Sequence, residues 1–136
     1  MSLLIVRHKA SLSLLYAFLE AGKVVSILSK TYFEILDQKF YHQKSNNENN
    51  NSVCVLFTQL NNHYLFTGDL EKEGETSLIE YNPTLPHVQL FKAGHHGSDT
   101  ANNDVLLSKI TPEVVCISCC AGGKKFNFPK EEEIGF

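Results

Sequence analysis

The chain has 136 residues, 43% of them hydrophobic, and a formal net charge of -3 at pH 7. This length fits one domain with an ordinary hydrophobic core. The 12 basic residues are scattered among 15 acidic ones, whereas nucleic-acid-binding proteins usually gather basic side chains on one surface. No apolar run approaches the roughly 20 residues that span a bilayer. The composition therefore disfavours autonomous nucleic-acid binding and membrane insertion.

The four cysteines predict reduced thiols in a cytosolic setting, because they are too few for the disulfide framework of a small secreted protein. Cys116 and Cys119 have CxxC spacing, which occurs in zinc and redox sites. They lie in an apolar, strand-like run, and no second CxxC exists. A buried structural role is therefore the favoured interpretation for this pair, and Cys120 is expected to be the exposed thiol.

The first third of the chain predicts a helix followed by strands. Apolar side chains recur at helical spacing over residues 10–20. Residues 24–28 form a β-branched run suited to a buried strand, and residues 32–41 predict a further strand pair. The Asn-rich segment 45–52 contains no apolar residue. It predicts a loop, because Asn side chains compete with regular structure for backbone groups.

A hairpin comes next, in which strands at 53–58 and 63–67 flank a turn at residues 59–62. Residues 71–81 then predict a helix with an acidic first turn, stopped by Pro83 and Pro86.

Strand and helix continue to alternate in the last part of the chain. A strand is predicted at 88–93, a helix at 102–110 and a final buried strand at 114–118. Short connections between alternating elements predict the α/β class, with a mixed sheet flanked by helices.

Two glycine-containing turns carry side chains that can bind metal. Asp69 follows Thr67 and Gly68 at one strand end, and Gly-His-His-Gly-Ser at 94–98 follows the next strand. Glycine permits sharp turns, and open α/β sheets bind ligands at the carboxyl ends of their strands. We therefore expect the two motifs to meet. One Asp with one or two His is a natural fragment of a two-metal hydrolytic centre.

The same residues have simpler structural interpretations. Asp69 suits a turn in which its side chain accepts hydrogen bonds from nearby backbone N–H groups. His95 and His96 suit a polar loop that caps the following helix through Ser98 or Thr100. A third alternative is an anion-binding cradle beside a helix N-terminus. Its residues would be Gly94, Gly97 and Ser98.

Four motifs follow one another between about residues 10 and 129. They are Asn50-Asn51-Ser52, residues 65–71 with Glu75 soon after, residues 91–98, and Pro112 leading into residues 114–118. This succession resembles the metallo-β-lactamase superfamily and, within it, the soluble hydrolase domain of ComEC-type competence proteins, which are associated with DNA uptake. The resemblance implies that residues 1–136 are a single domain, the C-terminal half of a metallo-β-lactamase-like domain. The expected fold is a partial αββα sandwich, with 45–52 as a loop.

The resemblance also implies roles for the two turns. Asp69 matches the family's metal-bridging aspartate and His95 a histidine that binds the second metal, while His96 completes the catalytic set. In such enzymes the paired ions, zinc or manganese, activate water for attack on a phosphodiester or a similar bond. Nucleic acid is then a candidate substrate.

The sequence departs from the family pattern in two places. The family's main metal motif, HxHxDH, is absent from the chain, and Asn127-Phe128-Pro129 stands where members often have a histidine before the proline. Zinc needs about four donors, or three and a water. We therefore expect the isolated chain to bind zinc or manganese weakly or not at all, and to show weak or no hydrolase activity.

Three functional interpretations stay open. The chain is a non-catalytic relative, a phosphodiesterase completed by another chain or an upstream segment, or a non-metal anion-binding or interaction module. Because a missing half would leave apolar surface exposed, we expect a homo-oligomer or association with that half. The lone chain is expected to be soluble and cytoplasmic, and a ComEC-like parent would be membrane-associated.

Overall fold

The computed structural model describes residues 24–28 and 30–119, which form a six-stranded mixed sheet with two helices. The strands are β1 (Val24–Leu28), β2 (Thr31–Leu36), β3 (Cys54–Gln59), β4 (Asn62–Phe66), β5 (Leu90–Lys92) and β6 (Val114–Cys116). The helices are α2 (Lys72–Tyr81) and α3 (Asp104–Ile110). Short 3-10 turns are η1 (Lys39–Tyr41), η2 (Glu48–Asn51) and η3 (Gly94–Gly97). The predicted α/β class is confirmed.

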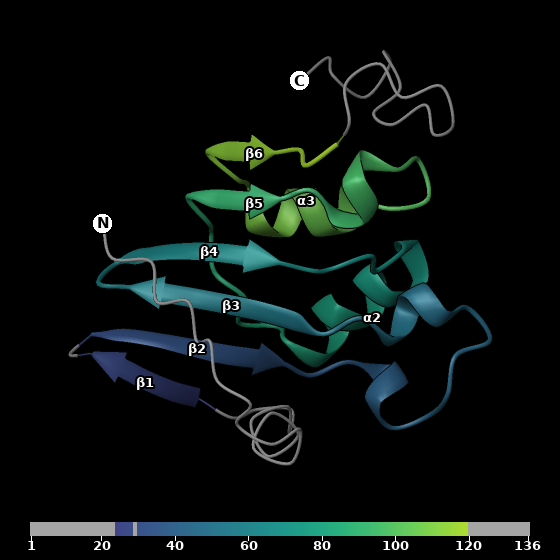
Figure 1. Ribbon diagram of the computed structural model, residues 1–136, viewed down its shortest axis with the longest axis horizontal. Coiled ribbons are helices and arrows are strands. Elements are labelled where there is room, and N and C mark those ends of the chain that lie inside the picture. The colour runs from purple at the N-terminus through teal and green to yellow at the C-terminus, as the bar shows by residue number, and fades with distance from the viewer. Residues whose placement is uncertain (1–23, 29, 120–136) are drawn as a thin grey trace.

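The strands lie in the sheet in sequence order, and their directions change halfway (Figure 1). β1 to β4 are antiparallel neighbours, whereas β4, β5 and β6 are parallel. The parallel steps cross over through α2 and then α3, and both helices pack on one face of the sheet (Figure 1). The predicted hairpin is confirmed as β3 and β4, with a tight turn in which Leu60 has a positive φ of 58°.

The core lies between the sheet and the two helices. Inward-facing strand residues alternate with outward-facing ones, as in Cys54, Leu56 and Thr58 of β3, all of which are buried. The residues that form the core cluster are Leu36, Cys54, Leu56, Leu65, Leu70, Leu78, Leu85, Val88, Phe91, Leu106 and Ile110. Full burial of each large apolar side chain stabilises the fold by about 1.5 to 3 kcal/mol.

Two sequence predictions are modified by the structure, and the helix predicted at residues 10–20 lies outside the described residues. The strand pair predicted over 32–41 is one strand followed by a 3-10 turn. The chain leaves the sheet there because the buried Gln38 side chain donates to the carbonyls of Asn50 (2.9 Å) and Ser52 (3.1 Å). The strand predicted at 88–93 is limited to three residues.

The strand predicted at 114–118 is present as β6, limited to Val114–Cys116, but the prediction that it is buried is wrong. Within the described part of the chain β6 pairs only with β5, so it forms an edge of the sheet, and Val114 is 54% exposed. Cys116 and Cys119 are exposed free thiols, which removes the basis for a buried structural role. Cys120 lies outside the described residues.

Replacing Gly74 in α2 by alanine is expected to destabilise the protein. The new Cβ would lie 2.8 Å from Leu70 Cγ and 2.9 Å from Asn50 Oδ1, both in buried residues. Overpacking costs about 1 to 3 kcal/mol, and the better helix propensity of alanine recovers about 1 kcal/mol. Urea unfolding should show a net loss of about 1 kcal/mol, whereas Glu80→Ala, at an exposed position of α2, should change stability by less than about 0.5 kcal/mol.

Candidate functional site

Three loops meet at one edge of the sheet. The parallel strands β4 and β5 end there, which brings the turn at 67–70 beside the loop at 94–98. β3 runs antiparallel to β4 and therefore begins at the same edge, so the Asn-rich segment 45–52 joins them. A backbone hydrogen bond from His95 N–H to the Gly68 carbonyl (2.9 Å) connects the first two loops. The predicted meeting of the two motifs is confirmed.

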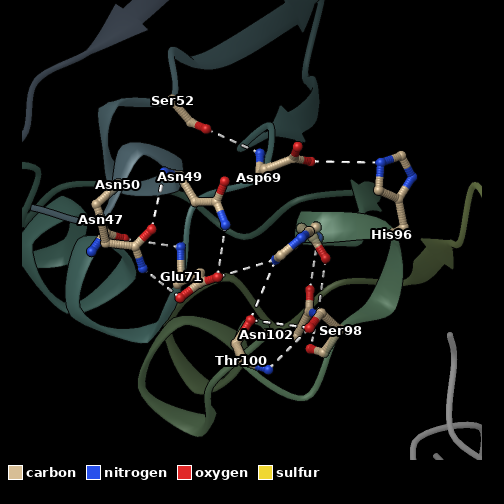
Figure 2. Close-up of polar contacts among 12 residues, drawn as sticks. Asn47, Asn49, Asn50, Ser52, Asp69, Glu71, His96, Ser98, Thr100 and Asn102 are labelled. Carbon is tan, nitrogen blue, oxygen red and sulfur yellow. Dashed lines mark hydrogen bonds and ion pairs between the residues drawn. The ribbon is translucent and has the colours of Figure 1, made fainter. Parts of the chain in front are cut away.

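The turn after β4 presents Asp69 at the surface. Gly68 has a φ of 62°, and a Cβ there would lie 3.1 Å from the Ser52 hydroxyl, so both the backbone conformation and the close approach favour glycine. Asp69 N–H donates to that hydroxyl (3.1 Å), and Leu70 N–H closes the turn on the Thr67 carbonyl (3.2 Å). The Asp69 side chain stays 47% exposed, and its carboxylate points toward His96 (Figure 2).

The loop after β5 holds three consecutive residues in the left-handed region. The φ values are 45° for His95, 57° for His96 and 78° for Gly97. This conformation is costly for residues with a Cβ, by roughly 1 kcal/mol or more each. The surrounding hydrogen bonds must offset that cost. The resulting backbone places the two imidazole rings near each other, with ring centroids 6.4 Å apart.

His96 faces Asp69 with a defined tautomer. Its Nδ1 lies 2.8 Å from the Ser118 carbonyl oxygen, which can only accept a hydrogen bond, so Nδ1 carries the proton. In the neutral ring the lone pair is then on Nε2, which lies 3.7 Å from Asp69 Oδ1 (Figure 2). That separation is too long for a hydrogen bond. The pair can act as an ion pair or as two converging donors to one cation.

His95 faces a different carboxylate. Its Nδ1 lies 3.3 Å from Glu71 Oε1 and 3.3 Å from the Thr100 hydroxyl. A carboxylate on one ring nitrogen orients an imidazole and leaves the other nitrogen as the basic atom. The family resemblance predicts that His95 acts with Asp69, whereas in the folded chain Asp69 faces His96 and His95 contacts Glu71.

Glu71 connects the histidine loop to the Asn-rich segment. Its carboxylate accepts from Asn47 Nδ2 (2.6 Å) and Asn49 Nδ2 (2.8 Å), as Figure 2 shows. Burial raises the pKa of Glu71, but the hydrogen bonds from Asn49, Asn47 and Thr100 and the charge of His95 outweigh it, so the pKa lies below its ordinary value. Glu71 is thus a stable anion at the centre of the site.

The Asn-rich segment has a structural role that its composition did not predict, because it binds Glu71. It is ordered by η2, and Asn50, which is 2% exposed, accepts from the Glu71 backbone N–H (3.1 Å). The predicted hairpin contained a signal for this contact, because an antiparallel hairpin places the residue before β3 beside the residue after β4. The composition of the segment, without apolar residues, concealed this.

The three residues proposed as an anion cradle face inward. Gly94, Gly97 and Ser98 are buried. The N–H groups of Gly94, His95 and Ser98 already donate to protein oxygens. Helix α3 is capped by the Asn103 side chain, which accepts from Leu106 N–H (2.8 Å). These contacts do not favour anion binding by the loop, nor helix capping by Ser98 or Thr100.

The described residues supply a fragment of a metal site. Within 24–28 and 30–119 no group of three or more His, Cys, Asp or Glu side chains is arranged to hold a metal ion. Asp69 Oδ1 and His96 Nε2 converge as two donors, and zinc requires about four, or three and a water. The donor set therefore does not fit a complete centre.

The chain is similar to competence and recombination proteins from three bacteria. Recombination protein 2 of Haemophilus influenzae is 35% identical over 71 residues, 52% of this chain and 9% of that protein. Competence protein ComA of Neisseria gonorrhoeae is 36% identical over 56% of this chain and 11% of its own length. ComE operon protein 3 of Bacillus subtilis is 34% identical over 51% of this chain and 9% of its own length.

The chain thus spans about a tenth of the curated relatives that it matches, and it is similar to competence and recombination proteins over about half of its own length. No protein-family model matches the sequence. No solved structure matches it. In the part of the chain that the structure describes, neither helix is long and apolar enough to cross a bilayer.

Glu71→Gln is expected to change how stability depends on pH. Because the pKa of Glu71 is lower in the folded chain than its ordinary value of 4.5, the ionised carboxylate favours folding above pH 4.5. This contribution decreases as the pH falls through the lowered pKa. The difference in unfolding free energy between wild type and variant, measured with urea at several pH values, should therefore be largest at neutral pH and shrink in acid.

Glu73→Gln is the matched control, since Glu73 is exposed and forms a surface ion pair with the partly exposed Lys39 (3.3 Å). Surface pairs of this kind contribute little. A pH-independent effect of Glu71→Gln would contradict the assigned role of its charge.

Proposed function

We propose that the chain is a competence-protein-related module that contributes part of a metal-dependent hydrolase site and is not a competent hydrolase by itself. The metallo-β-lactamase-like assignment, with residues 1–136 as the C-terminal half of such a domain, is part of this proposal. Phosphodiesters, including nucleic acids, are the proposed substrate class. The names of the three similar proteins support the link to competence.

One observation carries the proposal: Asp69 Oδ1 and His96 Nε2 converge at the edge of the sheet, 3.7 Å apart. Zinc binds imidazole nitrogen and carboxylate oxygen at about 2.0 to 2.2 Å, so two donors at this separation can contact a common ion. The Ser118 carbonyl fixes the His96 tautomer that donates through Nε2. His95, oriented by Glu71, is the proposed third donor.

The incomplete donor set explains why the chain is proposed to be inactive alone. Two or three donors hold a divalent ion weakly, and a dinuclear centre needs further ligands from elsewhere. A bound pair of cations would supply an activated water. Glu71 would orient His95, and the hydrogen bonds of the Asn-rich segment to Glu71 would hold that carboxylate in place.

The outer face of the sheet supports a second part of the proposal, that the chain associates through this face with a second copy. The face opposite the helices is apolar, with Phe33 and Phe57 rings 4.6 Å apart and Tyr64 5.6 Å from Phe57. Phe66 and Val114 on the same face are 39% and 54% exposed. Exposed apolar side chains of this kind mark an interaction surface, and the same surface on two copies can pair about a two-fold axis.

Metal titration tests the proposed site. Asp69→Asn and His96→Ala should each weaken zinc binding by more than the roughly tenfold that loss of an outer-shell partner costs, as measured by calorimetry on the full chain. His87→Ala is the matched control, because His87 precedes β5 and contacts Thr111 and Glu113, which precede β6, at the opposite ends of these parallel strands. Equal affinity in all four proteins would refute the assignment.

Hydrolysis of bis(p-nitrophenyl) phosphate tests the absence of activity. With zinc or manganese added, the wild-type chain should hydrolyse the ester no faster than the metal in buffer, because donors are missing. Turnover by the wild-type chain alone that is lost in Asp69→Asn would show that the site is complete, contrary to the proposal.

Light scattering after size exclusion tests the association. The wild-type chain should elute as a dimer, and Phe66→Lys should shift it to a monomer because a charge enters the apolar patch. Val105→Lys is the matched control, since Val105 is 50% exposed on α3, on the helix side of the sheet. A wild-type monomer at micromolar concentration would overturn this part of the proposal.

A further inference from the structure

Glu75 is a fully buried carboxylate that lies outside the site just described. It belongs to α2 and is 0% exposed. Its two oxygens accept from the backbone N–H groups of Asn102 (2.7 Å) and Asn103 (2.8 Å). Burying a carboxylate is costly unless hydrogen bonds compensate it. A leucine at this position would pack in the core without that cost. The role of the carboxylate is therefore to be sought in the groups that it binds.

Asn102 is the residue that Glu75 holds, and it has an unusual backbone. Its φ is 59°, in the left-handed region. In this conformation the Asn102 side chain turns back toward the loop after β5 (Figure 2). Its Oδ1 accepts from Gly94 N–H (2.7 Å), while its Nδ2 donates to the Gly94 carbonyl (3.2 Å) and, at longer range, to the Ser98 carbonyl (3.4 Å).

The Asn102 carboxamide therefore binds both ends of the strained segment. Gly94 precedes His95, and Ser98 follows Gly97, so the three left-handed residues lie between the two points of attachment. Gly94 is also packed closely, since a Cβ there would lie 3.1 Å from Thr67 Oγ1. With the ends fixed, the loop cannot relax to an ordinary backbone conformation without breaking these bonds.

We propose that Glu75 and Asn102 are positioning residues, which together hold the 94–98 loop in the strained conformation that directs His96 toward Asp69 and His95 toward Glu71. Glu75 fixes the Asn102 backbone, and the Asn102 side chain fixes Gly94 and Ser98. Both residues act on the imidazoles through the loop backbone. This inference rests on the proposed function, because positioning has meaning only if the imidazoles act together with the carboxylates.

Asn102→Gly removes the carboxamide alone. Glycine keeps the backbone N–H that Glu75 accepts from, and it adopts positive φ readily. The Gly94 amide should then exchange with deuterium about tenfold faster, as expected for loss of one hydrogen bond. The ring nitrogen resonances of His95 and His96 should shift, and the Nδ1-protonated signature of His96 should weaken. Lys30→Gly, at an exposed position that also has a positive φ, is the matched control and should leave both readouts unchanged.

Glu75→Gln weakens the hydrogen bonds between the Glu75 side chain and the backbone N–H groups of Asn102 and Asn103. The glutamine amide offers one acceptor where the carboxylate offered two, so one backbone N–H loses its partner. The same resonances should shift in the same direction as in Asn102→Gly, whereas Glu80→Gln, exposed on the same helix, should not move them. If Glu75→Gln does not fold, Asn102→Gly decides the question alone.

Unchanged histidine resonances and Gly94 exchange in folded Asn102→Gly would overturn the inference. These measurements use neither metal nor substrate. Zinc affinity that is equal in the wild type, Asp69→Asn and His96→Ala would therefore count against the proposed function, while the same spectra would still test the positioning of the loop.

Discussion

The site depends on one carboxylate shared between chain segments. Glu71 follows β4, accepts from two asparagines that precede β3, and contacts an imidazole that follows β5. Direct hydrogen bonds at 2.6 and 2.8 Å to an ionised group are among the stronger polar interactions in a protein. Removal of this charge would leave three loops at the sheet edge without their common partner.

The site also illustrates how local strain is tolerated. Two consecutive histidines with positive φ would not persist in an isolated loop. Here the backbone bond from His95 to Gly68 and the contacts of Asn102 hold them from both sides. Because strain of this kind persists only where the surroundings over-determine it, its position beside Asp69 is itself an indication of function.

The sequence predicted the back half of the fold better than the details of the site. Alternating strand and helix signals located β4, α2, β5 and α3, because hydrophobic periodicity and prolines act locally. The pairing of His96 with Asp69 could not be read in advance, since it depends on three φ angles set by tertiary contacts. The exposure of Val114 and Cys116 also could not be predicted from the sequence, because an apolar run has the same composition in an edge strand as in a central strand.

Cys54 has a chemical environment unlike that of the two exposed thiols. It begins β3 with 0% exposure, and burial, followed by the charge of Glu75, raises its pKa to about 12. A thiol that is both shielded and protonated does not react with alkylating reagents. Its modification therefore requires the strand to separate from the helices, which makes Cys54 an internal reporter of global opening, while Cys116 and Cys119 report the native surface.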